Sequence, residues 1–474
     1  MKSAEQSVEA HPSTSRLTNI FNKFKMVSGP VYISVMLFGM STWIAVVGVW
    51  IEMPLLVNAL PESWNLPSYL VIIVQCANLG PAMYAIWDKI RQRNQQARDE
   101  HHQDEYPQQQ QQQSHIDREV VMSLIIILTA ILSMLLLSLF WDHTAVIASV
   151  NRSVALLTLV SFASLACCTS SVVFLPYMAR FPSVYISAYY FGQGLCGLLP
   201  GLLGLAQVVG QEPQCRNETD INDTTVTVST SDVTLTPGYT VYYSSPRFSV
   251  GAMFALITVL LCVSAVAFCC LNFVDKCRSK LLDAAVDDSQ PVNADEATAA
   301  RDASMQEATG LLESRENSKS NSTPSDSIEI QTPVRVVIQR RRYASLLVTI
   351  GIISALWNGI LPATQTYTCL PYGNIVYRLS VCLSWVVSPL ATLPNMLAPT
   401  SSLPLIVGLG AAASVLSALH LLLAAQSPHP ILQGTVIGQV IVVSRQLCHT
   451  HYCEIFGSRD ILVTKTNTSL CSLN

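Results

Sequence analysis

The chain has 474 residues, of which 50% are apolar and only 12% are charged. Soluble domains average about 25% charged residues, so this composition argues against a soluble globular protein. The formal net charge of −4 does not indicate nucleic-acid binding, since the basic residues sit in short loops, and no nucleic-acid partner is expected.

Apolar windows recur along the chain, and a window of about 20 residues can cross a bilayer as an α-helix. We therefore expect an all-α polytopic membrane protein with about ten transmembrane helices. In chain order, the predicted spans cover residues 30–53, 67–87, 120–140, 153–175, 183–209, 248–274, 343–363, 373–393, 402–425 and a shorter run at 431–443.

Polar segments between the spans predict their orientation. These segments are residues 1–29, 88–119, 210–246 and 275–342. The 210–246 segment contains two glycosylation sequons, at Asn217 and Asn222, whereas the other segments carry clustered Lys and Arg and 275–342 is expected to be disordered. Cytoplasmic loops hold the excess of Lys and Arg, and sequons are glycosylated outside the cytoplasm. Both signals predict a cytoplasmic N-terminus, cytoplasmic loops at 88–119 and 275–342, and an extracellular, glycosylated loop at 210–246.

Six predicted spans precede the 275–342 segment, which divides the chain into a first helical half, 30–274, and a second, 343–444. A Trp, a Pro and a following Leu-Pro occur in both halves, at Trp50, Pro54 and Leu66-Pro67 and at Trp357, Pro362 and Leu370-Pro371. Parallel repeats related by an axis along the membrane normal are a transporter architecture. The sequence predicts a two-halved transporter bundle, and a parallel six-helix repeat and a chance similarity both remain as explanations of the shared pattern.

Polar and aromatic side chains lie inside the predicted spans, where polar groups are costly and usually face a bundle interior or a cavity. Gln75 and Asn78, three residues apart, share one helix face. The candidate substrate-binding residues are Trp43, Trp50, Glu52, Asn78, Thr169, Gln193, Asn358 and Gln365. For each polar residue taken alone, tying helices together by hydrogen bonds is the alternative role. As a set, aromatic faces and amides suit a neutral aromatic ligand.

Enzyme motifs are missing from the sequence, which has no Walker loop, no His-Glu-x-x-His and no Gly-x-Ser-x-Gly. The adjacent cysteines Cys167-Cys168 and Cys269-Cys270 lack the spacing of metal ligands. We therefore expect a protein that is not an enzyme and that needs no cofactor or metal. Cys215 and Cys369 fall in predicted outside loops, so a disulfide between them is left open. Arg378 is interpreted as snorkelling from span eight to the outer interface.

Over residues 31–440 the chain resembles the riboflavin transporters of solute carrier family 52, of vertebrate type. In the first half the resemblance is carried by Phe38-Gly39-Met40, Trp43, Val49-Trp50-Ile51-Glu52-Met53-Pro54, Leu60-Pro61-Glu62-Ser63-Trp64, Leu66-Pro67-Ser68-Tyr69-Leu70, Ala77-Asn78-Leu79-Gly80-Pro81, Cys168-Thr169-Ser170-Ser171, Phe174-Leu175-Pro176 and Phe191-Gly192-Gln193-Gly194-Leu195. In the second half it is carried by Asn358-Gly359-Ile360-Leu361-Pro362 and Gln365-Thr366-Tyr367-Thr368-Cys369-Leu370.

This resemblance implies facilitated or proton-assisted uptake of riboflavin across the plasma membrane, by eleven helices with an alternating-access cavity between two halves. Riboflavin has a planar isoalloxazine ring with a uracil-like edge, which agrees with the aromatic and amide set. The chain departs from the family pattern at Val47, where relatives carry Asn, and at Arg378, where they carry His. Two other interpretations stay open: a cell-surface receptor, including a virus receptor, and a transporter of another neutral aromatic solute such as a nucleoside.

The C-terminal segment 445–474 differs in character from the rest of the chain. Arg445 and Gln446 interrupt the last apolar run after about 13 residues, which is too short to cross a bilayer unaided. We expect an atypical polar tail in place of the family's final helices, as a shifted reading frame or an alternative exon end would produce. Retention of this form in the ER and weaker transport are the expected consequences.

Overall fold

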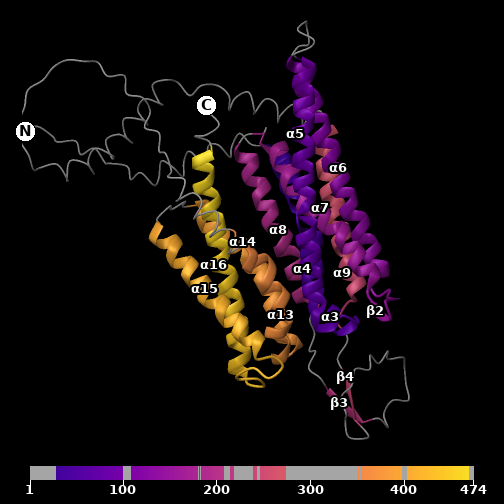
Figure 1. The fold of residues 1–474 in the computed structure, drawn as a ribbon, viewed down its shortest axis with the longest axis vertical. Helices are drawn as coiled ribbons and strands as arrows, with labels where there is room; N and C mark the ends of the chain where they lie inside the picture. Colours follow the sequence, from indigo (N-terminus) through magenta and orange to yellow (C-terminus); the bar gives the residue numbers. More distant parts are fainter. Residues whose placement is uncertain are drawn as a thin grey trace, which may run out of the picture.

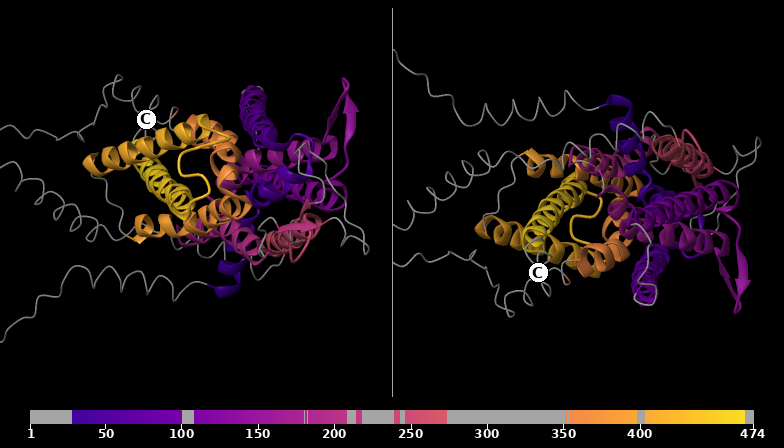
Figure 2. Two further views of the ribbon diagram at one scale, coloured as in Figure 1. Left: turned by 90° about the horizontal axis from the view of Figure 1, so that it is seen from below. Right: turned by 90° about the horizontal axis from the view of Figure 1, so that it is seen from above.

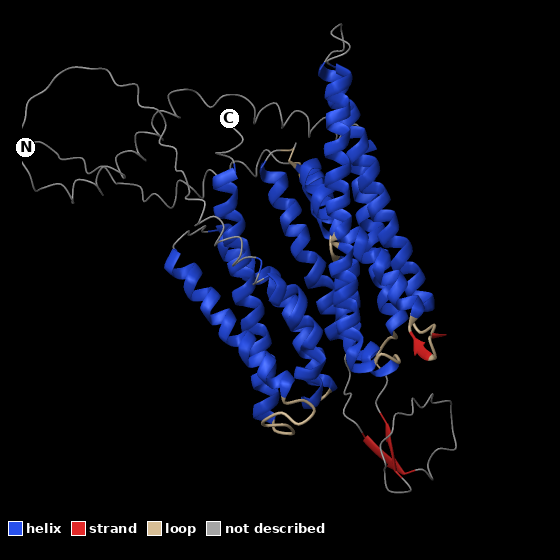
Figure 3. Ribbon diagram, viewed as in Figure 1, coloured by secondary structure: helices blue, strands red, loops and turns tan. Residues whose placement is uncertain are grey.

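The computed structural model describes residues 28–99, 108–179, 181, 183–207, 214–217, 239–242, 246–273, 351, 354–397 and 403–468. In this part of the chain nearly all regular structure is helical, and the strands form two short antiparallel pairs (Figure 3). The predicted all-α class is confirmed. Residues 1–27 of the predicted tail 1–29, the 275–342 segment and the sequon at Asn222 lie outside the described residues.

The helices form two groups, which lie side by side in the views along the long axis (Figure 2). The N-terminal group comprises α2 (Gly29–Met40), α3 (Ile44–Ala59), η1 (Ser63–Asn65), α4 (Leu66–Ala77), α5 (Leu79–Asp99), α6 (Gln108–Phe140), α7 (Val154–Met178), α8 (Ser183–Gln207) and α9 (Val250–Phe273). The C-terminal group comprises the π-helical turn η3 (Leu356–Ile360), α13 (Leu361–Cys369), η4 (Leu370–Tyr372), α14 (Asn374–Leu397), α15 (Leu403–Ala425) and α16 (Val436–Thr468).

The short strands mark one end of the bundle. β1 (Ala145–Ile147) and β2 (Val150–Arg152) form a hairpin between α6 and α7, and β3 (Gln214–Asn217) pairs with β4 (Tyr239–Tyr242) between α8 and α9. Both pairs lie at the same end as η1 and α13 (Figure 1). We call this the hairpin end, and the other, which carries the α7–α8 junction, the opposite end.

Five helices in the described residues are long and apolar enough to cross a membrane, and the bent pair α2 and α3, with an angle of 53° between them, adds a sixth if counted as one span. Three further predicted spans are helical as α8, α14 and the first part of α16. Span seven, 343–363, falls partly outside the described residues. The structure is that of a polytopic membrane protein.

Much of the polar segment 88–119, which is predicted to be a loop, is helical in the structure. α5 continues to Asp99 and α6 begins at Gln108. Gln, Arg, Lys and Glu dominate these extensions, and such straight-chain residues lose little side-chain freedom in a helix, so the helices can continue past the apolar windows.

The break between α2 and α3 is stabilised by its own side chains. The Ser41 hydroxyl donates to the Phe38 carbonyl at 2.7 Å, and the Thr42 hydroxyl donates to the Gly39 carbonyl at 2.9 Å. The same carbonyls also accept the backbone N–H groups of Ser41 and Thr42, at 3.1 and 3.3 Å, so the break leaves neither carbonyl unpaired, which would be costly in a membrane interior. Trp43 follows at the start of α3, where the chain changes direction.

An aromatic cluster joins α2, α7 and α9 in the core of the N-terminal group. The Phe38 ring centroid lies 4.6 Å from that of Phe174 and 4.7 Å from that of Phe268. Gly39 and Gly192 make the neighbouring α2–α8 crossing possible, because a Cβ on either glycine would overlap the backbone of the other helix.

α16 does not end where its apolar run does, since the helix continues to Thr468. Arg445 and His449 on this continuation are only 4% and 3% exposed. The His449 Nε2 atom lies 2.7 Å from the Ser417 hydroxyl of α15, and its ring stacks on Trp357 with centroids 5.2 Å apart. The sequence predicts an atypical polar tail from residue 445 in place of the family's final helices; instead the segment is helical to Thr468, and polar side chains such as His449 pack inside the C-terminal group.

Candidate functional site

The two groups of helices meet along two seams, α8 with α14 and α4 with α13. The α8–α14 seam is close because α8 presents glycines to α14. A Cβ on Gly197 would lie 3.0 Å from the Trp385 ring, and one on Gly201 would lie 3.0 Å from the Val386 side chain. Small residues at such a contact let helix backbones approach each other in a membrane.

A buried charge cluster lies where this seam reaches α3. Glu52 of α3 and Arg378 of α14 are 0% and 1% exposed, and the Arg378 Nη2 atom lies 3.8 Å from the Glu52 Oε1 atom. The same Nη2 atom donates a hydrogen bond to the side-chain oxygen of Gln207, the last residue of α8. The interpretation of Arg378 as a snorkelling side chain is wrong, because a partner charge within the protein compensates it.

A chain of amides lies along the α4–α13 seam. The Gln75 Nε2 atom donates to the Asn358 backbone carbonyl at 2.9 Å, and the Asn78 Nδ2 atom donates to the Gln75 Oε1 atom at 3.2 Å. All three residues are exposed. Asn358 belongs to the π-helical turn η3, a kind of irregularity that is frequent at functional sites. The structure thus brings together two predicted site residues, Asn78 and Asn358, from different halves of the sequence.

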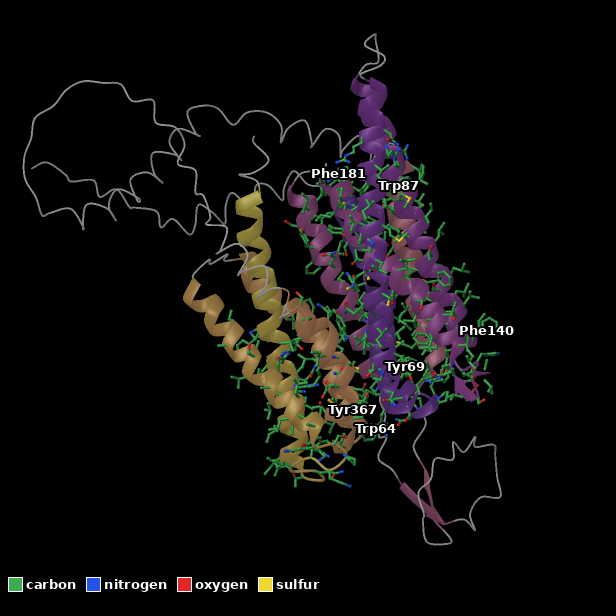
Figure 4. All side chains as sticks on the ribbon, in the orientation of Figure 1. Trp64, Tyr69, Trp87, Phe140, Phe181 and Tyr367 are labelled. Atoms are coloured by element: carbon green, nitrogen blue, oxygen red, sulfur yellow. The ribbon has the colours of Figure 1, made fainter. Side chains whose placement is uncertain are left out.

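Nearer the hairpin end, aromatic and polar side chains join η1 to α13. The Tyr367 hydroxyl donates to the Asn65 Oδ1 atom at 2.7 Å, and the Tyr367 and Trp64 rings meet edge to face with centroids 5.7 Å apart. Figure 4 shows these two rings next to each other at the hairpin end. The Ser68 hydroxyl also donates to the Ala363 carbonyl, at 3.2 Å.

The other predicted site residues are distributed over the bundle. Trp43 and Trp50 are half-buried and pack against the core of the N-terminal group. The Thr169 hydroxyl donates to the Leu165 carbonyl of its own helix at 2.7 Å, and the Gln193 Nε2 atom donates to the Tyr189 hydroxyl at 3.4 Å. Gln365 is 8% exposed within α13. The contacts of these residues do not join them into one site.

A cavity of about 430 Å³ lies between α5, α6 and α7. Its lining residues are Tyr84, Ala85, Asp88, Lys89, Arg118, Glu119, Val172, Val173 and Pro176. The Arg118 and Asp88 side chains approach to 3.6 Å there. None of the predicted substrate-binding residues lines this cavity, which belongs entirely to the N-terminal group.

Several polar contacts of the structure involve residues that are not among the candidates predicted from the sequence. Gln207 and Asn58 each contact a side chain of the C-terminal group, and His420 accepts or donates hydrogen bonds with Thr364 and Thr368 at 3.0 and 3.1 Å. Each of these residues is a polar residue within or at the end of an apolar window, and this position is the feature of the sequence that could have identified it. Among the described residues no group of three or more His, Cys, Asp or Glu side chains could hold a metal ion.

The predicted covalent features are only partly within the described residues. Asn217 ends β3, whereas Asn222 lies outside the described chain. Cys369 is a free thiol and is 0% exposed at the end of α13.

Comparison with known proteins identifies relatives along most of the chain. The sequence model of the family described as "Solute carrier family 52, riboflavin transporter" matches residues 28–99 and 108–455. Member 3-A from Danio rerio is 33% identical over 421 residues, which are 87% of this chain and 84% of the relative. Member 2 from Sus scrofa is 33% identical over 412 residues, 87% of this chain and 82% of the relative. Member 3 from Homo sapiens is 28% identical over 439 residues, 87% of this chain and 85% of the relative. No solved structure matches.

Proposed function

The chain belongs to solute carrier family 52, the riboflavin transporters, and from this membership we propose that it carries riboflavin across a cell membrane. The observation that carries the proposal is the extent of the family match, residues 28–99 and 108–455. This match includes both groups of helices and both seams between them. In this proposal riboflavin is carried without chemical change, so the protein is not an enzyme.

We place the protein in the plasma membrane with a cytoplasmic N-terminus, and we propose uptake by alternating access with proton coupling. The support for this orientation is the distribution of charge and sequons along the chain. The 210–246 segment follows α8, which ends at the hairpin end, so the hairpin end is the outer end in this proposal. ER retention is an alternative location, and surface biotinylation distinguishes the two.

We propose that riboflavin binds between the two groups of helices, with Trp43, Trp50, Glu52, Asn78, Thr169, Gln193, Asn358 and Gln365 as the contributing residues. The support is the amide chain of Gln75, Asn78 and Asn358, because amides offer the paired donors and acceptors that a uracil-like edge requires. Trp50 offers an aromatic face, and stacking of this kind contributes about 0.5–1.5 kcal/mol.

Uptake of radiolabelled riboflavin by cells that express the chain tests this function. We expect uptake above that of vector-transfected cells, competition by unlabelled riboflavin and lumiflavin, no competition by nucleosides, and faster uptake at acidic external pH. Competition by nucleosides alone would assign the protein to another aromatic solute. Surface expression without uptake of either solute would favour a receptor.

The contribution of Trp50 can be measured in the same assay. Trp50→Ala should raise the KM for riboflavin by about fivefold, which corresponds to the loss of about 1 kcal/mol of stacking. Trp87→Ala is the matched control, because Trp87 is 44% exposed at the opposite end (Figure 4). Equal KM values for the two variants at equal surface levels would remove Trp50 from the site.

The orientation of the chain can be tested through its sequons. We expect N-glycans on Asn217 or Asn222, because both asparagines lie in the segment that the charge distribution places outside. Glycosidase digestion should increase the gel mobility of the parent, and the double variant Asn217→Gln/Asn222→Gln should migrate like the digested parent. A parent that digestion does not shift would contradict the outer location of this segment.

A further inference from the structure

The contacts between the two groups of helices include a set that lies at the ends of their elements, at the hairpin end. Asn58, which precedes the last residue of α3, donates from its Nδ2 atom to the Oδ1 atom of Asn374, the first residue of α14, at 3.1 Å. Asn65 of η1 accepts the hydrogen bond of Tyr367 near the end of α13. The Glu52–Arg378 pair lies one or two helical turns further into the bundle on the same two helices, α3 and α14.

These contacts differ in chemistry from the α8–α14 seam. Around Gly197 and Gly201 the seam is a packing of glycines against larger side chains, and its polar contact, the Gln207–Arg378 hydrogen bond, lies towards the hairpin end. By contrast, the hairpin-end contacts are hydrogen bonds, an aromatic pair and an ion pair, which form or break as discrete events. Towards the opposite end, α15 leans away from the N-terminal group (Figure 1).

The buried ion pair has the properties of a latch. Separating Glu52 from Arg378 without water would leave two buried charges uncompensated, so the pair disfavours any movement of α14 away from α3 that does not also admit water. Among the residues that the structure describes, none is a hydrogen-bond partner of the Nε and Nη1 atoms of Arg378. A buried donor without a partner is satisfied when water reaches it. The pair is therefore stable while the hairpin end is closed, and it can be hydrated when that end opens.

We propose that these contacts form the outer gate of the transporter, closed in this structure, and that the Glu52–Arg378 pair is the latch of the gate. The gate set is Asn58–Asn374, Asn65–Tyr367, Trp64–Tyr367 and Glu52–Arg378. This inference rests on the proposed transport function and orientation. It assigns to these residues the control of access from the outer side, and it requires that α3 and η1 separate from α13 and α14 in each transport cycle.

A reversible cross-link across the gate tests the proposal. The side chains of Asn58 and Asn374 are in contact, and Asn58 is exposed, so the double variant Asn58→Cys/Asn374→Cys should form a disulfide under a mild oxidant. We expect riboflavin uptake to fall in proportion to the cross-linked fraction and to return when a reductant cleaves the disulfide. The reduced double variant serves as its own reference for expression and folding.

The matched control is a disulfide at the same end that stays within one group of helices. Val146 and Asn151 are paired across the exposed β1–β2 hairpin, where opposite Cα atoms are about 4.5–5.5 Å apart, so Val146→Cys/Asn151→Cys should also be cross-linked. Its oxidation should leave uptake unchanged. Unchanged uptake by a fully cross-linked Asn58/Asn374 variant would overturn the gate.

The latch is tested by the rate of cross-linking, which does not depend on transport. Arg378→Gln in the Asn58→Cys/Asn374→Cys background should slow disulfide formation, because the two ends spend more time apart without the ion pair. An equal rate would remove the latch from the proposal. Riboflavin binding to the purified protein, measured by quenching of riboflavin fluorescence, separates the gate from the transport function. Binding without uptake in the cross-linked form supports a closed outer gate. Absence of both binding and uptake in the reduced form would contradict the proposed function itself.

Discussion

Replacing Arg378 with alanine is expected to destabilise the protein by about 3–5 kcal/mol, because the change leaves the Glu52 carboxylate buried without its counter-charge. Both side chains are at most 1% exposed and lie 3.8 Å apart, so water cannot replace the guanidinium without a rearrangement of α3, α8 and α14. The measurement is thermal stability of the detergent-solubilised protein, together with the surface level in cells.

The matched control for this prediction is Arg247→Ala. Arg247 is exposed near the hairpin end, and its side chain donates one hydrogen bond, to the Ala206 carbonyl at 3.2 Å, so the loss of this side chain should change stability by about 0.5 kcal/mol or less. The double variant Glu52→Gln/Arg378→Ala should recover part of the lost stability, because it removes the uncompensated charge. Equal stability of Arg378→Ala and Arg247→Ala would contradict a buried ion pair at this position.

The second large effect is expected at the α2–α8 crossing. A Cβ on Gly192 would overlap the Met36 carbonyl and lie 3.1 Å from the Gly39 Cα atom, and both obstacles are backbone. The two helices must therefore move apart to accept Gly192→Ala, and overpacking of this kind costs about 1–3 kcal/mol. The aromatic cluster around Phe38 lies on the same part of α2, so the cost should appear as a lower melting temperature of the whole N-terminal group.

Gly29→Ala is the control for the crossing. Gly29 is the first residue of α2, and a Cβ there would meet nothing within 4 Å. The same chemical change on the same helix should leave the melting temperature nearly unchanged. A melting temperature for Gly192→Ala that equals that of Gly29→Ala would show that α2 and α8 leave room for a Cβ at residue 192, which would contradict close packing at this crossing.

The fold class and the family can be predicted from the sequence, because both are indicated by short stretches of sequence. Apolar windows of membrane length predict helices wherever they occur, and motifs such as Val49-Trp50-Ile51-Glu52-Met53-Pro54 identify relatives without reference to contacts. The extent of α16 was predicted less well. Its stability beyond Ser444 depends on partners such as Ser417 and Trp357, which lie on other helices.

The candidate site was predicted only in part, because a helical period gives the face of a residue and not its partner. The sequence predicts that Gln75 and Asn78 share one helix face, yet their connection to Asn358 depends on how α4 meets η3. Glu52 is a candidate because a carboxylate is costly in a membrane, whereas the position of its partner Arg378 near a span end predicts snorkelling. Proximity across the two groups decides both roles, and no local pattern encodes that proximity.

Transport by the purified protein in liposomes tests the central claim most directly. Radiolabelled riboflavin should accumulate in proteoliposomes faster than in protein-free liposomes of the same lipid, unlabelled riboflavin should suppress the signal, and unlabelled nucleosides should not. The reduced and oxidised forms of Asn58→Cys/Asn374→Cys provide an internal comparison in the same membrane. Rates equal to those of protein-free liposomes, from protein that remains monodisperse and folded, would contradict the claim that this chain is a riboflavin transporter.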